Sequence, residues 1–119
     1  MRKVNIKEKF DQIGEFESPK IVGELNGQYV KLSKLKGEFV WHSHENEDEL
    51  FLVVSGRLRM KLRSGDVVLE EGEFFIVPRG VEHNPIAEPE CHILLFEPMT
   101  TLNTGDVINE KTIEDLEWI

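Results

Sequence analysis

Turn signals recur at short intervals along most of this chain, and their spacing limits the folds that it can adopt. In each signal a glycine follows a polar residue, and the stretches between signals are short and rich in valine, leucine, isoleucine and phenylalanine. The signals are Asn26-Gly27, Lys36-Gly37, Ser55-Gly56, Ser64-Gly65-Asp66, Glu71-Gly72 and Arg79-Gly80. Short β segments joined by tight turns are typical of an antiparallel sandwich or barrel. We therefore expect an all-β fold.

The N-terminal residues carry a different pattern. Asn5-Ile6-Lys7-Glu8 has the form of a helix-capping sequence, and apolar residues follow at helical spacing at Phe10 and Ile13. Ser18-Pro19 disfavours continuation of a helix. A short N-terminal helix is expected here.

The sequence predicts a single domain over residues 1–119, because a chain of this length forms one hydrophobic core. The core is expected over roughly residues 20–98, flanked by an N-terminal segment (1–19) and a C-terminal tail (99–119). The tail is more polar, and a brief helix is predicted over residues 112–119 from its apolar spacing.

Composition excludes several classes of function. The formal net charge of −9 disfavours nucleic acid as a partner, because phosphates would be repelled. The longest apolar run, Leu50–Val54, is too short to span a membrane, and the first residues do not resemble a signal peptide. A single cysteine, Cys91, cannot form an internal disulfide. These features together predict a cytoplasmic protein with neither membrane nor nucleic-acid partners.

Three histidines and one glutamate form a candidate metal-binding set. His42 and His44 are two residues apart, so on a β-strand their imidazoles project from the same face. Glu49 opens the apolar run that begins at Leu50, and His83 follows a Pro-x-Gly turn that would place it at the end of another strand. Such donors suit a divalent transition metal such as Fe, Mn, Ni, Co or Zn.

Several neighbouring residues compete for these roles. Glu45, Glu47 and Asp48 lie in the same turn as Glu49, which is favoured because it stands at the head of a strand. His92 follows Cys91 directly, and adjacent strand residues face opposite sides, so the two are not expected to share an ion. We expect His92 to pack near the pocket or at a strand edge, and Cys91 to be a small buried apolar residue.

This pattern resembles the first conserved motif of the cupin superfamily. That motif reads Gly, a short spacer, His-x-His, three or four residues, Glu, six residues and Gly. Here His44 and Glu49 have four residues between them, and Glu49 and Gly56 have six. The spacing from Gly37 to His42 is one residue shorter than is usual in the family.

The second cupin motif reads Gly, five residues, Pro-x-Gly, two residues, His, three residues and Asn. Gly72, Pro78, Gly80 and His83 match it, whereas Ala87 replaces the closing Asn. The resemblance is closest to small single-domain cupins that are described as similar to phosphomannose isomerases. It implies a double-stranded β-helix, the jelly-roll barrel of cupins, with short helical segments at both ends.

The resemblance implies metal-dependent chemistry but leaves the reaction open. Lewis-acid catalysis would give a sugar or sugar-phosphate isomerase, and oxygen chemistry would give a dioxygenase, in which Glu49 could also transfer a proton. A non-catalytic module that binds or senses a small molecule is a third alternative. Tyr29, Arg79 and Glu82 are the nearest candidates for a base outside the metal ligands.

Apolar alternation predicts the lining of the pocket. The side chains expected to face inward are Val40, Phe51, Val53, Leu58, Met60 and Leu62. An apolar pocket suits a small aromatic or enolic molecule, which favours oxygenase chemistry. In the same strand Arg57, Arg59, Lys61 and Arg63 alternate on the other face. We interpret this basic stripe as a solvated face, with an anionic partner as the alternative.

The residues opposite the predicted ligands are also apolar. If the histidines and Glu49 point inward, Phe39, Trp41, Leu50, Leu52 and Val54 point outward. A strand that is apolar on both faces needs cover on both faces. The cover would come from the N-terminal segment, a second subunit or both, and cupins often pair sheet against sheet. We therefore expect a homodimer.

Overall fold

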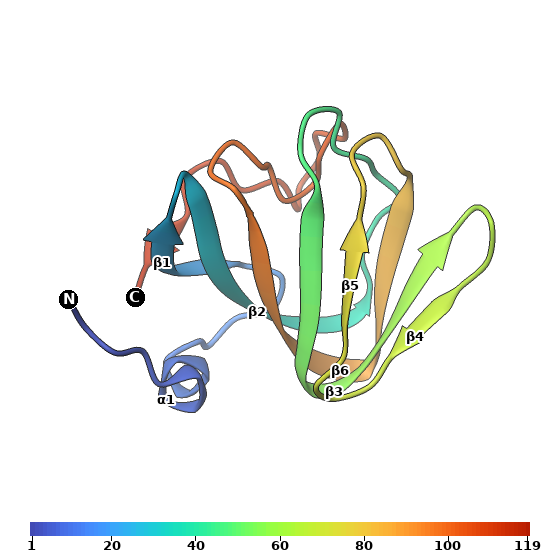
Figure 1. Ribbon diagram of the computed structural model, residues 1–119. Coiled ribbons are helices and arrows are strands. Elements are labelled where there is room, and N and C mark those ends of the chain that lie inside the picture. Colours follow the sequence, from blue (N-terminus) through green and yellow to red (C-terminus); the bar gives the residue numbers. More distant parts are fainter.

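The computed structural model describes residues 1–119 and shows a curved, mostly antiparallel sheet that closes into a barrel (Figure 1). Its elements are α1 (Ile6–Asp11), β1 (Lys20–Leu25), β2 (Gln28–Glu38), β3 (Glu49–Leu62), β4 (Val67–Leu69), β5 (Phe74–Val77), β6 (His83–Pro98) and β7 (Glu117–Trp118). The strand order is β4-β3-β6-β2-β1-β7, and β5 pairs with β3. The prediction of an all-β fold is confirmed.

Two long strands, β3 and β6, form most of the barrel. They pair antiparallel along their whole length, from Leu50 opposite Phe96 to Leu62 opposite His83, with register shifts near Gly56. Both strands bend at these shifts, so that both ends of each strand lie at the same end of the barrel (Figure 1). Gly56 has φ +88°, and a Cβ there would lie 2.5 Å from the Glu90 carbonyl oxygen, so only glycine allows the two strands to cross this closely.

The main hydrophobic core fills the barrel around this bend. Phe51, Val53, Leu58 and Met60 of β3 alternate along its inner face and are at most 3% exposed, as their spacing predicted. The other buried members are Leu35, Leu69, Val77, Ala87, Cys91, Ile93 and Leu95. Cys91 is the small buried residue expected, and burial raises the pKa of its thiol to about 12.

A second, smaller core lies on the outer face of the sheet. The N-terminal helix forms as predicted: the Asn5 side chain accepts a hydrogen bond from the Glu8 amide at 3.0 Å and caps it. Phe10 and Ile13 then pack on Leu32 of β2. The N-terminal segment thus covers part of the apolar outer face of its own barrel.

The predicted C-terminal helix over residues 112–119 is wrong. Residues 117–118 form β7, which pairs in parallel with β1, and the Ile119 amide donates to the Ile21 carbonyl at 3.1 Å. Trp118 meets the Tyr29 ring edge-on, with centroids 5.7 Å apart. The chain end gains backbone partners at the open edge of β1, which a short isolated helix would lack.

The basic stripe of β3 lies on the outer face. Its arginines pair with carboxylates on the neighbouring turns and strands: Arg57 with Glu70, Arg59 with Glu88, and Arg63 with Glu82. The side chains of these pairs are 36% to 61% exposed, which agrees with a solvated face. None of the helices in the structure has the length and apolar character needed to cross a bilayer.

Candidate metal centre

The four predicted ligands come together at the end of the barrel opposite the bend. Glu49 begins β3, His83 begins β6, and His42 and His44 lie in the segment that leads from β2 to β3. An isolated bridge between His42 and His83 joins that segment to β6. All four residues are at most 4% exposed, and one donor atom from each lies within 4.8 Å of the others.

Backbone carbonyls orient two of the imidazoles. Nδ1 of His42 lies 2.9 Å from the Val40 carbonyl oxygen, and Nδ1 of His83 lies 2.9 Å from that of Val81. Because a carbonyl only accepts, each Nδ1 carries a hydrogen, so Nε2 is the ring nitrogen that could bind an ion. A second partner of this kind is typical of histidines that bind metals.

The remaining contacts converge on one carboxylate oxygen. Glu49 Oε1 lies 3.2 Å from Nε2 of His83 and 3.1 Å from Nε2 of His44. The His44 approach lacks hydrogen-bond geometry, and neither ring nitrogen of His44 has a hydrogen-bond partner although both are buried. A buried polar group without a partner is costly. Three imidazoles and a carboxylate, with one imidazole unpartnered, fit a divalent transition metal.

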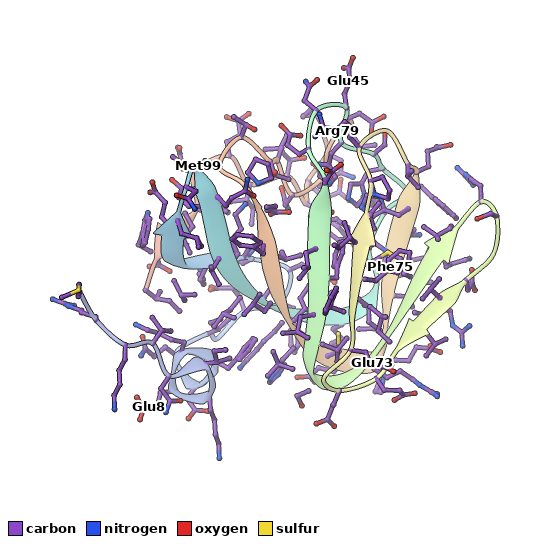
Figure 2. All side chains as sticks on the ribbon, viewed as in Figure 1. Glu8, Glu45, Glu73, Phe75, Arg79 and Met99 are labelled. Atoms are coloured by element: carbon purple, nitrogen blue, oxygen red, sulfur yellow. The ribbon has the colours of Figure 1, made fainter.

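The acidic residues of the turn before β3 take different positions, as expected. Glu45 is exposed and points away from the barrel (Figure 2). Glu47 accepts a hydrogen bond from Thr100 at 2.8 Å, and Asp48 accepts from the Arg79 amide at 2.9 Å. Only Glu49 of this turn lies in the cluster, because it alone enters the inner face of β3.

The surroundings of the site lower the pKa values of two of the candidate ligands, His42 and Glu49. Burial, with smaller contributions from the nearby His83 and His44, lowers the pKa of His42 from 6.5 to about 4, so this imidazole is neutral at pH 7. Burial alone would raise the pKa of Glu49. The neighbouring Glu97, His44 and His83 side chains outweigh this effect and hold the pKa of Glu49 well below its ordinary range.

Sequence reasoning missed a second buried carboxylate beside Glu49. Glu97, near the end of β6, is 2% exposed, and its Oε1 accepts from Lys31 Nζ at 2.9 Å. Burial and the negative charge of Glu49 raise the pKa of Glu97 well above its usual value, and Lys31 opposes that shift. Lys31 lies on β2 and Glu97 on β6. The two can be recognised as a pair only when the register of these strands is known.

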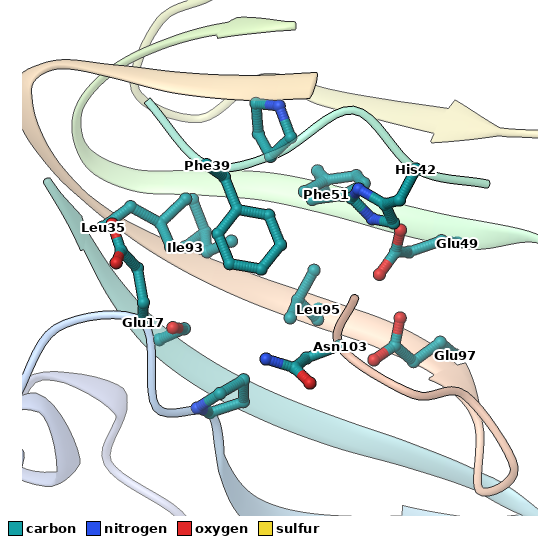
Figure 3. Close-up of a pocket in the computed structure, with 13 residues that line it drawn as sticks. Glu17, Leu35, Phe39, His42, Glu49, Phe51, Ile93, Leu95, Glu97 and Asn103 are labelled. Atoms are coloured by element: carbon teal, nitrogen blue, oxygen red, sulfur yellow. The ribbon is translucent and has the colours of Figure 1, made fainter. Parts of the chain in front are cut away.

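A pocket extends from the metal centre into the barrel (Figure 3). His42, Glu49 and Glu97 line one end, and Glu17 lines the other. Its apolar lining is Leu35, Phe39, Phe51, Ile93 and Leu95, and Ser33 and Asn103 add polar groups.

Phe39 extends into this pocket, so the prediction that it points outward is wrong (Figure 3). A register shift between Lys36 and Gly37 and the end of β2 at Glu38 break the strand alternation before Phe39. The Phe39 ring meets His42 edge-on at 5.5 Å. Trp41 does lie outside, with the Arg63 guanidinium 3.8 Å from the centre of its ring.

The predicted apolar stripe lines the core more than the pocket. Among its members only Phe51 borders the pocket, while Val53, Leu58 and Met60 are packed in the core around the bend. The pocket is consequently more polar than the sequence suggested, with three glutamates along it.

The other candidate residues lie away from the cluster. Arg79 pairs with Asp48, Glu82 pairs with Arg63, and Tyr29 packs against Trp118. His92 is outside the barrel rather than near this pocket and stacks on Phe10 at 4.8 Å. None of the four belongs to the cluster of candidate ligands.

Ala87, which replaces the motif Asn, is 2% exposed and belongs to the main core. The substitution therefore places a methyl group among apolar neighbours.

Solved structures resemble this chain closely. A cupin-2 domain protein from Shewanella frigidimarina is 41% identical, with a TM-score of 0.78, over 80% of this chain and 93% of that one. Protein NMB1881 from Neisseria meningitidis is 31% identical, with a TM-score of 0.75, over 82% of this chain and 99% of that one. These similarities agree with the jelly-roll barrel that the motifs implied.

A curated relative has a named activity. The 3-hydroxyanthranilate 3,4-dioxygenase of Xenopus tropicalis is 30% identical over 106 residues, which are 79% of this chain and 36% of that protein. The chain spans 56% of the length of one curated relative that it matches and 36% of the length of another. Residues 29–97 match the Cupin domain family. With both motifs, the barrel and this match in place, the chain belongs to the cupin domain family.

Proposed function

We propose that this protein binds one divalent transition metal through His42, His44, Glu49 and His83 and uses it on a small molecule held in the adjoining pocket. The observation that carries the proposal is the convergence of four buried donors within 4.8 Å, with both ring nitrogens of His44 unpartnered. The metal is Fe, Mn, Ni, Co or Zn, because mixed imidazole and carboxylate donors suit these ions.

Dioxygenase chemistry is the activity that the pocket supports best. An ion in this centre would supply Lewis acidity toward a chelating substrate oxygen or redox chemistry with dioxygen. Phe39, Leu95 and Phe51 offer apolar surface to a planar ring and exclude water beside the donors. The similarity to a 3-hydroxyanthranilate dioxygenase supports the same choice of an aromatic or enolic substrate.

Glu49 and Glu97 would accept and return protons in this reaction. Glu49 faces both the histidines and Glu97, so a proton leaving a substrate hydroxyl can pass to the carboxyl pair without entering solvent. A sugar-phosphate isomerase is less well supported, because no lysine or arginine side chain lines the pocket to bind a phosphate.

The ligand assignment is tested by metal content. The purified protein should hold close to one equivalent of metal by elemental analysis, and His83→Ala should hold none. Glu49→Gln should weaken metal binding by much more than Glu47→Gln or Asp48→Asn, which serve as matched controls from the same turn. Equal losses in all three acidic variants would contradict the assignment.

The activity is tested by oxygen uptake. The metal-loaded protein should consume oxygen with a member of a panel of aromatic and enolic compounds, and the His83→Ala variant should not. Full metal binding without turnover of any compound would favour a non-catalytic binding module.

We also propose that the protein is a homodimer. Leu50 and Leu52 of β3 are half-buried on the outer face, and they pair with Ile76 and Phe74 of β5, which are 49% and 60% exposed. Phe96 pairs with Leu50 on the other side, so these side chains form one apolar strip beyond the area that α1 covers. A second copy packing its own strip there would bury both.

Light scattering at micromolar concentration tests this assembly. The wild type should have the mass of a dimer, and Phe74→Lys should have the mass of a monomer. Leu25→Lys, at an apolar residue that is 48% exposed elsewhere, is the matched control and should stay dimeric. A monomeric wild type would contradict the proposal.

A further inference from the structure

The metal-ligand segment is held from two sides. His42 exchanges two backbone hydrogen bonds with His83, at 3.0 and 2.9 Å, and the His44 carbonyl accepts from the Gly80 amide at 2.8 Å. These bonds tie His42 and His44 to the second cupin motif. Ser43, between them, points its backbone groups the other way, toward the C-terminal tail.

Part of that tail, residues 100–112, forms a strap across the ligand segment. The Asp106 amide donates to the Ser43 carbonyl at 3.0 Å, and the Asp106 side chain accepts from the Ser43 amide at 2.9 Å. Both backbone groups of Ser43 are therefore bound by one residue of the strap. Thr100 binds Glu47 of the following turn at 2.8 Å.

Gly105 allows the strap to lie close to the ligand segment. Its φ of +56° is left-handed, and a Cβ at this position would overlap the Ser43 carbonyl oxygen and lie 3.0 Å from Cδ2 of the His42 ring. No side chain can be added there unless the strap or the ligand segment moves. The glycine thus touches both the backbone beside the two histidines and one of the imidazoles.

The strap has its own internal bonds, which make it a firm support. Thr104 is fully buried, and its hydroxyl lies 2.6 Å from that of Thr112. The Asn103 side chain donates to the Lys111 carbonyl at 2.8 Å and accepts from the Ile113 amide at 2.9 Å. Asn103 also lines the pocket, so the strap contributes to the ligand space as well.

We infer that the strap is a positioning element of the metal centre, with Gly105 and Asp106 setting the backbone that places His42 and His44. The strap lies outside residues 29–97, which match the family, so this support belongs to the chain's own tail. The inference rests on the proposed metal binding. Residues that orient metal ligands typically change metal affinity about 10- to 100-fold when they are altered.

The experiment measures Co²⁺ binding to the full-length chain by titration and by its visible absorption spectrum. Gly105→Ala and Asp106→Ala should weaken binding about 10- to 100-fold and alter the spectrum. Asp106→Asn, which keeps an acceptor oxygen for the Ser43 amide, should restore most of the affinity. Gly27→Ala is the matched control: its φ is also left-handed, at +78°, but nothing lies within 4 Å of the added Cβ.

Thermal unfolding of the metal-free variants separates support of the site from support of the fold. Should Gly105→Ala fail to fold, the comparison of Asp106→Ala with Asp106→Asn decides. Wild-type affinity and an unchanged spectrum in Asp106→Ala would overturn the inference. A wild type and a Gly27→Ala variant that both fail to bind Co²⁺ would instead overturn the metal-binding proposal itself.

Discussion

The two ends of the barrel interior are built on the same pair of strands and are equally buried, yet they have opposite chemistry. At the bend of β3 and β6, Val53, Leu58 and Ile93 are at most 1% exposed and pack on one another. At the other end, His83 and Glu97 are at most 2% exposed and keep polar atoms that need partners. We call these regions the bend end and the metal end.

The two ends contribute differently to the stability of the fold. Apolar side chains stabilise the fold as soon as they leave water, whereas buried polar groups stabilise it only when each has a partner. At the metal end the partners are incomplete, since both ring nitrogens of His44 and one side-chain oxygen of Glu97 have none. The bend end therefore supplies most of the apolar stabilisation of the barrel, and the metal end retains buried polar atoms without partners.

The largest expected effect is at the buried ion pair of the metal end. Glu97→Leu should destabilise the metal-free protein by about 3–5 kcal/mol, because it leaves the buried Lys31 ammonium without its carboxylate. Urea unfolding measures the change. The double variant Lys31→Met/Glu97→Leu should recover most of the loss, since it removes both charges. No recovery would show that packing at Glu97, and not charge pairing, is responsible.

A cavity at the bend end should cost nearly as much. Met60→Ala removes a fully buried side chain from the main core and should lower the free energy of unfolding by roughly 2–5 kcal/mol. Metal affinity should remain within about threefold of wild type, since Met60 borders neither the ligands nor the pocket. A large loss of metal affinity in the folded variant would contradict the division between the two ends.

The pH dependence of stability should come mainly from the metal end. The folded pKa of His42 is about 4 and its ordinary value is 6.5, so between these values the unfolded chain binds more protons. Stability of the metal-free protein should fall as the pH drops through this window, by on the order of 3 kcal/mol at most. His42→Gln should flatten the profile in urea unfolding, and an unchanged profile would contradict this origin.

The smallest effect is expected on the outer face. Arg57 and Glu70 are 2.7 Å apart but about half exposed, so solvent screens the pair. Arg57→Ala should change the free energy of unfolding by less than about 1 kcal/mol. Thermal unfolding at low and high salt measures this change. A loss comparable to that of Glu97→Leu would show that burial is not what separates the two ion pairs.

Local patterns predicted the cluster of four candidate ligands because each member lies in a short, regular context. His42 and His44 are two residues apart, and Glu49 begins an alternating strand, so their shared direction follows from backbone geometry alone. The capping sequence at Asn5 predicted α1 for the same reason. Phe39 was placed on the wrong side because a register shift between Lys36 and Gly37 interrupts the alternation.

Contacts between distant residues had no such local signal. Lys31 and Glu97 are 66 residues apart, and the pair forms only after β2 and β6 are aligned. The tail looked like a polar segment with a terminal helix, but its bonds to Ser43 and β1 join residues far apart in the chain. Polar tails have no periodic pattern from which such partners can be read.

By itself, the sequence determined an all-β barrel, a capped N-terminal helix and four candidate ligands, because turn chemistry and side-chain alternation act over a few residues. Only the tertiary structure decided that Glu97 and Lys31 stand beside the metal centre, that Phe39 enters the pocket and that the strap holds Ser43. These features depend on strand register and on the close approach at Gly105, which arise when the whole chain packs.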